Sequence, residues 1–228
     1  MKGSLSSLEA GRAAAEGIRL ARPEARIVVK PLADGGEGTV EALTAGLGGE
    51  FVTVPVHGPL GEAVTARYGI LPDGTAVMEM AEASGLTLVP GDRLDPWRAS
   101  TYGTGEMIRD ALGRGCRDFL IGIGGSATTD GGTGMLAALG YEFLDSRGQP
   151  AAPGIGELDR IDRICAANRL PELEQCSFRI ACDVSNPLLG EQGAVWVYGP
   201  QKRVREEEKP ELDAKMLHFA EKTVEYTG

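Results

Sequence analysis

Two loops rich in glycine and acidic residues constrain the fold more than any other feature of this sequence. Residues 33–39 (ADGGEGT) follow the apolar run 27–29, and residues 122–132 (GIGGSATTDGG) follow the apolar run 119–121. A segment with helical hydrophobic spacing comes after each loop. Glycines after a buried strand allow a tight turn and a close approach of the backbone to a ligand, and amides at the start of the next helix favour anions. The pattern therefore predicts strand–loop–helix units with ligand-binding loops.

Carboxylates lie among the glycines of both loops, at Asp34, Glu37 and Asp130. Because carboxylates would repel a bare phosphate, they indicate a bound metal or a substrate with hydroxyl groups. A purely structural interpretation competes with this one: the acids of the first loop would cap a helix, and the second loop would be an ordinary glycine turn. We interpret the two loops together as belonging to a phosphate-handling enzyme rather than to a passive binding module.

Composition excludes several classes of protein. The 228 residues are 42% hydrophobic and 25% charged, which is typical of a globular chain. A net charge of −10 argues against a general nucleic-acid surface, although a small site can still be locally positive. The four cysteines form no C-x-x-C pair, so neither structural zinc nor a disulfide framework is expected. Because the sequence has no signal peptide and no long apolar run, we expect a cytoplasmic protein without a membrane partner.

Hydrophobic periodicity predicts a mixed α/β fold. Strands are expected at 26–30, 51–56, 63–70, 76–80, 119–121 and 178–182, with the three between 51 and 80 antiparallel. Helices are expected at 8–21, 40–45, 104–112, 134–139 and 210–226. In the last helix the spacing predicts an apolar face of Leu212, Met216, Phe219 and Val224.

Three further segments carry candidate ligand-binding groups. Residues 100–106 (STYGTGE) combine hydroxyls with a helix start, which makes Thr104 a candidate donor to a carboxylate or phosphate. Asp183 and Asn186 follow a predicted strand, where open α/β sheets bind ligands. Lys202 is a cation after a Gly-Pro turn, and an exposed lysine is the favoured interpretation there. His57 and His218 have no evident partner and are predicted to be non-catalytic.

A dinucleotide site is an alternative for the second loop, because residues 122–127 fit the pattern G-x-G-x-x-A. The additional residues 128–130 lengthen the turn, and Asp145 is no more than a chance match for the acid that would bind a ribose. No Walker sequence occurs either. A phosphate-binding loop with hydroxyl donors at Ser126 and Thr128, together with the backbone at Gly124 and Gly125, fits the residues better.

Taken in order, these segments resemble the type 1 glycerate kinase family. The resemblance covers nearly the whole chain, and seven motifs of modest individual specificity occur in the expected sequence. The matching runs are residues 2–6, 33–39, 80–85, 102–106, 122–132, 181–187 and 199–202.

The resemblance implies the ATP-dependent phosphorylation of D-glycerate, at the 2- or the 3-hydroxyl, with Mg²⁺ as a cofactor. It also implies two α/β domains with the site between them. We expect residues 1–74 to be part of a Rossmann-like domain and residues 75–228 to be an α/β domain inserted into it. An Asp-Ser-Phe before Lys2 and a C-terminal part of the family pattern are not in this sequence. We therefore expect a fragment that is poorly soluble and inactive when expressed alone.

Residue roles follow from the same resemblance. Lys2 is expected to neutralise phosphate charge, and Asp34 and Asp183 are the candidate metal ligands or bases. The expected substrate- or phosphate-binding residues are Gly35, Gly36, Glu37, Thr104, Gly124, Gly125, Ser126, Thr128 and Asp130. Two other hypotheses stay open at this point: an inactive remnant or binding module, and a nucleotide-linked dehydrogenase.

Overall fold

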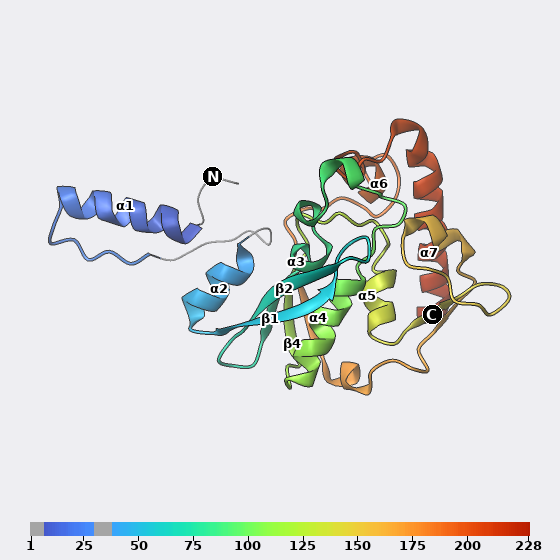
Figure 1. The fold of residues 1–228 in the computed structure, drawn as a ribbon, viewed down its shortest axis with the longest axis horizontal. Coiled ribbons are helices and arrows are strands. Elements are labelled where there is room, and N and C mark those ends of the chain that lie inside the picture. The colour runs from blue at the N-terminus through green and yellow to red at the C-terminus, as the bar shows by residue number, and fades with distance from the viewer. Residues whose placement is uncertain (1–6, 30–37) are drawn as a thin grey trace.

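The structure, a computed structural model, describes residues 7–29 and 38–228 (Figure 1). Its largest element is a five-stranded sheet with the order β1-β2-β3-β4-β7. The β1–β2 and β2–β3 pairs are antiparallel, whereas β3–β4 and β4–β7 are parallel. The strands of this sheet are β1 (Glu50–His57), β2 (Ala63–Ile70), β3 (Ala76–Glu79), β4 (Asp118–Gly122) and β7 (Ser177–Ala181).

Helices and a small second sheet complete the described part of the chain. None of the described helices combines the length and the apolar character needed to cross a membrane. The helices are α1 (Ser7–Ala21), α2 (Thr39–Leu47), α3 (Ala81–Ser84), α4 (Tyr102–Gly113), α5 (Thr133–Ala138), α6 (Ala194–Tyr198) and α7 (Lys209–Thr227). The second sheet pairs β5 (Glu142–Leu144) with β6 (Arg163–Cys165) in antiparallel orientation.

Helices α4 and α2 cover opposite faces of the large sheet. Side chains alternate between the two faces of a strand, and Tyr68 of β2 donates a 2.6 Å hydrogen bond to Asp110 of α4. Its neighbour Gly69 faces α2, where a Cβ would lie 1.8 Å from Thr44 Oγ1. Glycine at this position therefore allows α2 to approach the sheet closely. The core on the α4 side includes Met78, Met107 and Phe119, all fully buried.

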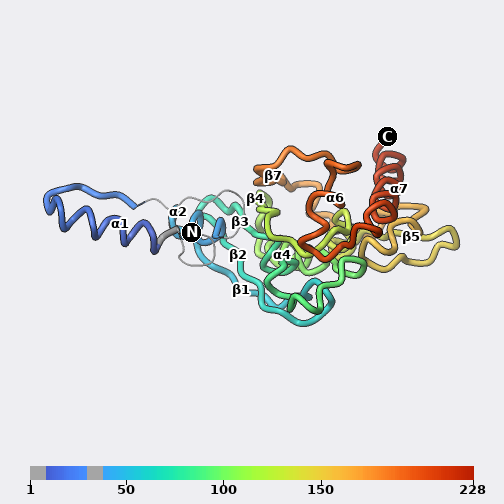
Figure 2. Tube along the Cα trace, turned by 90° about the horizontal axis from the view of Figure 1, so that it is seen from above, coloured from blue at the N-terminus to red at the C-terminus, as the bar shows by residue number. Residues whose placement is uncertain are grey.

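A second apolar core surrounds α7. Leu212, Met216 and Phe219 of this helix are buried. They pack with Phe143 of β5 and with residues of the 3₁₀ helix Ile155–Arg160. Figure 2 shows this region on one side of the sheet and α1 far away on the other. The chain thus has two packed regions, joined by α5 and its flanking loops.

Most of the predicted elements are confirmed, and three expectations are wrong. Residues 26–29 form no strand: no described strand lies beside them, and Val29 packs against Gly11 of α1. The apolar face predicted for α1 is largely open, with Ile18 47% exposed. On α7, Val224 is 66% exposed because the helix extends beyond the residues that pack on it.

Two further observations concern the strands. The large sheet continues across residues 74 and 75, since β2 pairs with β3; the division into two domains there stays a prediction. The strands β5 and β6 were not predicted, because three residues are too few for hydrophobic alternation to be visible.

We expect the chain as given to self-associate through β7. This strand is outermost in the described sheet, and its Ile180 is 53% exposed. Parallel strands are normally covered on both faces, and open apolar edges promote aggregation. Ile180→Lys should therefore raise the monomer fraction in sedimentation velocity. Leu217→Lys on α7, where Leu217 is 45% exposed, is the matched control. Equal monomer fractions for wild type and Ile180→Lys would contradict this expectation.

Candidate functional site

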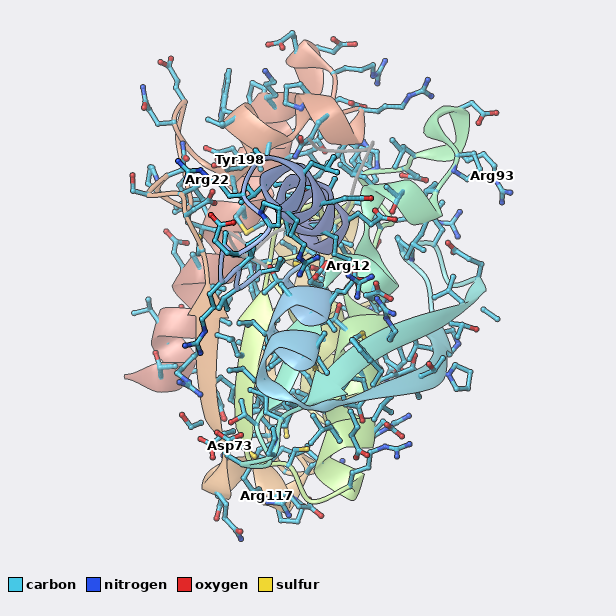
Figure 3. The ribbon with its side chains drawn as sticks, turned by 90° about the vertical axis from the view of Figure 1, so that its left-hand side faces the viewer. Arg12, Arg22, Asp73, Arg93, Arg117 and Tyr198 are labelled. Atoms are coloured by element: carbon cyan, nitrogen blue, oxygen red, sulfur yellow. The ribbon has the colours of Figure 1, made fainter. Side chains whose placement is uncertain are left out.

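The carboxyl ends of three parallel strands meet at one edge of the large sheet. Glu79 of β3 is in register with Gly122 of β4, and Gly122 with Ala181 of β7. Figure 3 shows the polarity: Asp73 and Arg117, which precede β3 and β4, lie at one end of the molecule, and Tyr198 lies toward the other. The segments that follow the strands therefore begin at the same edge: residues 80–85, which include the short helix α3, and the loops 123–132 and 182–187. Ligands of open α/β sheets bind at such edges.

The loop 123–132, called the anion loop below, is hydrogen-bonded to the segment that follows β3. Leu86 donates its N–H to Gly125 O at 2.9 Å, and Ala127 donates its N–H to Ser84 O at 2.8 Å. Beneath this contact the hydroxyls of Ser84 and Thr104 share a buried 2.8 Å hydrogen bond. Thr104, predicted to be a ligand donor, thus has a partner inside the protein and supports the loop from below.

Asp130 fixes the end of the anion loop. Its side chain is 1% exposed and accepts hydrogen bonds from the N–H and O–H of Thr101, both at 2.8 Å. The same carboxylate accepts the N–H groups of Gly132 and Gly134, each at 3.1 Å. The predicted residue is therefore in the site, and its described contacts are to the protein backbone and to Thr101.

The first part of the anion loop is the part open to solvent. Gly124 and Gly125 are exposed and Ser126 is half-buried, whereas Thr128 and Thr129 are buried. Gly125 has φ 72°, a left-handed conformation that glycine adopts without strain. Within the described residues, Thr129 Oγ1 is buried and has no hydrogen-bond partner. A ligand can therefore reach the backbone around Gly124 and Gly125, while the threonines face inward.

Glu79, the last residue of β3, connects the start of α2 to this edge. Its Oε1 accepts the N–H of Val40 at 2.8 Å, at the start of α2. Burial raises the pKa of the Glu79 carboxyl, and the N–H groups at the start of α2 partly oppose that shift. Because Glu79 ends β3, its bond to Val40 places the start of α2 at the carboxyl edge of the sheet. The predicted residues Lys2, Asp34, Gly35, Gly36 and Glu37 lie outside the described residues, and their roles stay predictions.

Asp183 places one carboxylate at the carboxyl edge, after β7. It is exposed and is the second residue after β7. Asn186, three residues later, accepts a 2.7 Å hydrogen bond from Tyr198 and donates one to Gln192 O, which holds the loop against α6. Across residues 7–29 and 38–228, no group of three or more His, Cys, Asp or Glu side chains is arranged to hold a metal ion.

Lys202 is the site residue that sequence reasoning underestimated. The favoured interpretation was an exposed lysine, but the side chain is 6% exposed. Its Nζ donates a hydrogen bond to Thr128 O in the anion loop, 74 residues away in sequence. Burial lowers the pKa of the Lys202 ammonium from 10.5 to about 8, and the nearby Asp130 charge partly opposes this. The only sequence signal was its position between a Gly-Pro turn and the apolar Val204.

This pKa predicts a stability that rises with alkaline pH. Between about pH 8 and the usual lysine value of 10.5, the unfolded chain holds a proton on Lys202 that the folded chain has lost. Stability therefore increases through that window, by up to about 3 kcal/mol for this group. In chemical denaturation from about pH 7.5 to about pH 9.5, wild type should gain stability relative to Lys202→Met. A pH-independent difference between the two proteins would contradict the assignment.

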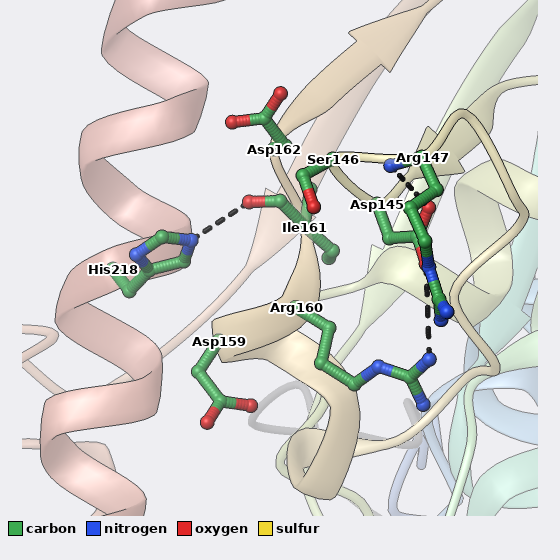
Figure 4. Close-up of a pocket in the computed structure, with 8 residues that line it drawn as sticks. All are labelled: Asp145, Ser146, Arg147, Asp159, Arg160, Ile161, Asp162 and His218. Carbon is green, nitrogen blue, oxygen red and sulfur yellow. Dashed lines mark hydrogen bonds and ion pairs between the residues drawn. The ribbon is translucent and has the colours of Figure 1, made fainter.

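A separate cavity of about 370 Å³ lies beside α7 (Figure 4). Arg147 and Arg160 on its wall both face Asp145, at 3.4 and 3.8 Å. His218 donates from Nε2 to Ile161 O at 2.7 Å, a partner that was not evident from the sequence, and its non-catalytic role stays a prediction. Both arginines of the wall are thus already paired with a carboxylate, so neither is free to bind an anion. The Asp145 carboxylate also accepts the N–H of Gln149 within its own turn. It is therefore engaged inside the protein and is a poor candidate for the acid that would bind the ribose of a dinucleotide.

The arrangement is that of an α/β protein with a glycine loop, a buried lysine and acidic residues at the carboxyl edge of parallel strands, where ligands of open α/β sheets bind. The chain belongs to the glycerate kinase family, whose model matches residues 1–228.

Individual relatives agree with this family. The chain is 48% identical over 221 residues to the glycerate 2-kinase of Escherichia coli K12, and 47% identical over 220 residues to a glycerate kinase of Halalkalibacterium halodurans. Each match covers 96% of this chain and 58% of the relative. A crystal structure assigned to glycerate kinase 2 of Salmonella typhimurium LT2 is 45% identical, with a TM-score of 0.90. That match covers 97% of this chain and 59% of the solved one, so the chain spans about three fifths of its relatives' length.

Proposed function

We propose that this chain carries a glycerate kinase site, which transfers the γ-phosphoryl group of ATP to a hydroxyl of D-glycerate. The observation that carries the proposal is the anion loop at the carboxyl edge of β4, in a chain 48% identical to a glycerate 2-kinase. Phosphoryl transfer depends mainly on positioning and on neutralising charge, and less on covalent chemistry by the protein. A loop whose backbone is open at Gly124 and Gly125 suits that task.

We assign some residues to direct contact with the ligands and others to holding the anion loop in place. The backbone at Gly124, Gly125 and Ser126 donates to phosphate or substrate oxygens. Thr104, Thr128 and Asp130 hold the loop, because their described polar contacts are within the protein. Four candidates lie outside the described residues. We assign Lys2 to neutralising phosphate charge, and Gly35, Gly36 and Glu37 to binding the substrate.

The carboxylates at the carboxyl edge are few, which suits a Mg²⁺ ion that takes only one or two of its ligands from the protein. Mg²⁺ at kinase sites is commonly bound by one or two carboxylates together with substrate phosphates, so a cage of protein ligands is unnecessary. Asp183 is an exposed carboxylate at the carboxyl edge, and it would hold the ion together with Asp34. The ion would neutralise phosphate charge when bound.

We propose the 2-hydroxyl of glycerate as the acceptor, because the E. coli relative is a glycerate 2-kinase. The product would then be 2-phosphoglycerate, which enolase dehydrates directly. Adding enolase alone to the reaction should therefore give phosphoenolpyruvate without a lag. A requirement for phosphoglycerate mutase would instead assign the 3-hydroxyl.

The activity is tested in a chimera in which residues 1–228 replace the matching segment of the E. coli enzyme. Glycerate-dependent release of ADP at a rate near that of the parent enzyme is expected. Glucose and a nucleoside are the competing acceptors, and both should be poor substrates, because aromatic residues that could stack on them make up 5% of the chain. A folded chimera that is inactive on glycerate, or that prefers either competitor, would overturn the proposal.

The same preparation separates the alternatives. Isothermal titration should show binding of ATP and of glycerate. Binding of NAD instead would favour a dehydrogenase, and binding of none of the three would favour a remnant without catalytic function. A cytoplasmic location remains our prediction.

A further inference from the structure

The burial of Lys202 needs an explanation. Lysine is almost never fully buried without a partner, because the charged group loses its hydration. Lys202 ends the 3₁₀ turn Pro200–Lys202, and the hydrogen bond from its Nζ to Thr128 O joins that turn to the anion loop. Asp130, two residues further along the loop, is the carboxylate whose charge acts on this ammonium. The buried charge is therefore matched to the anion loop rather than to a surface partner.

The backbone on both sides of Lys202 forms a constrained turn. Arg203 has φ 71°, and it is the only non-glycine residue with a left-handed backbone in the described chain. Such a conformation costs free energy and persists where the surroundings enforce it. Gly199 opens the same turn, where a Cβ would lie 2.2 Å from Val195 O. Val204 then closes the turn with an N–H donated to Gly199 O at 3.0 Å.

We propose that Lys202 is a positioning residue that holds the anion loop in its ligand-binding shape. Its ammonium fixes the carbonyl of Thr128, and the Asp130 carboxylate fixes Thr101, Gly132 and Gly134. The exposed backbone at Gly124 and Gly125 precedes these two fixed points and is held in place by them. Lys202 acts through Thr128, since its own side chain is buried. The effect of Lys202 on the shape of the loop can be tested without a ligand, whereas the use of the loop for ATP rests on the proposed function.

Hydrogen exchange of the 228-residue chain, followed by mass spectrometry, tests the proposal without a ligand. Lys202→Met removes the donor and keeps the length of the side chain. Peptides that cover 123–132 should then exchange about tenfold faster, with unchanged rates in β4 and α7. Lys209→Met is the matched control, because Lys209 is also buried but binds Glu206 at 2.6 Å instead of the anion loop. It should leave the exchange of 123–132 unchanged.

A second variant separates positioning from space-filling. Lys202→Gln retains an N–H donor without the aliphatic length, so a positioning role predicts that it restores more protection of 123–132 than Lys202→Met does. A space-filling role predicts the reverse order. If Lys202→Met does not fold, Lys202→Gln is compared with wild type instead. Faster exchange that is confined to residues 123–132 would then support the proposal. Unchanged loop exchange, or an equal increase in all peptides, would overturn the proposal.

Titration with ATP then connects this role to function. Lys202→Met should bind ATP about tenfold more weakly than wild type, because part of the binding energy is used to order the loop. If wild type binds no ATP, the proposed function fails for this chain, while the exchange rates still decide the role of Lys202. Weaker binding with unchanged loop exchange would assign Lys202 to direct contact with the nucleotide and would contradict positioning.

Discussion

Asp130→Ala should lower the free energy of unfolding by roughly 3–5 kcal/mol, the largest effect expected of any described polar side chain. The carboxylate is buried and satisfies four donors, two from Thr101 and one each from Gly132 and Gly134. Alanine leaves these donors without partners in the protein interior, where each unmade hydrogen bond is costly. Urea denaturation followed by circular dichroism measures the loss.

The controls for this prediction follow from the geometry. Asp130→Asn should cost less than alanine, because the amide oxygen can still accept from some of the four donors. Asp73→Ala removes an exposed carboxylate that accepts the Thr75 N–H at 2.9 Å in a turn, and it should cost much less than Asp130→Ala. Equal losses for Asp130→Ala and Asp73→Ala would show that the Asp130 network contributes little to folding.

Asp183→Asn should lower kcat of the chimera about 100-fold or more and leave its Tm unchanged. Asp183 is exposed at the carboxyl edge, and among the described residues no carboxylate cluster is present to replace it. Removing one charge from a site of this kind weakens the neutralisation of phosphate charge in the transition state. A coupled assay of ADP release gives kcat, and differential scanning calorimetry gives Tm.

An exposed aspartate outside the site is the control for Asp183. Asp92, in the 3₁₀ turn Gly91–Arg93, is exposed, so Asp92→Asn should leave both kcat and Tm unchanged. Asp34→Asn should behave like Asp183→Asn if both carboxylates serve the reaction. A fall in Tm with unchanged kcat would show that the carboxylate in question only supports the fold.

Local sequence patterns predicted the parts of the fold that depend on local physics. The β1–β2 hairpin was predicted from two runs of strand-forming residues around a turn, and every residue of β1 is paired in it. Likewise α4 and α7 were predicted from helical spacing, within two residues at each end. The anion loop could be recognised because glycine and acidic residues cluster directly after an apolar run.

Features that depend on distant partners could not be predicted in this way. Residues 26–29 have strand-like composition, but a strand forms only beside a neighbour, and the described structure gives them none. Lys202 has the sequence context of a surface lysine, and its burial follows from the position of Thr128, which only the tertiary fold brings near. For the same reason Glu79 was not assigned a site role, since its partner Val40 belongs to another element.

Hydrogen exchange with and without ATP plus D-glycerate tests most directly whether the carboxyl edge of β3, β4 and β7 is the ligand site. Both ligands together should slow exchange in peptides covering 80–86, 123–132 and 182–187, the loops that start at this edge. Peptides covering 145–162, which line the cavity beside α7, should exchange at unchanged rates. Protection of 145–162 with no change in 123–132 would contradict the assignment of the site.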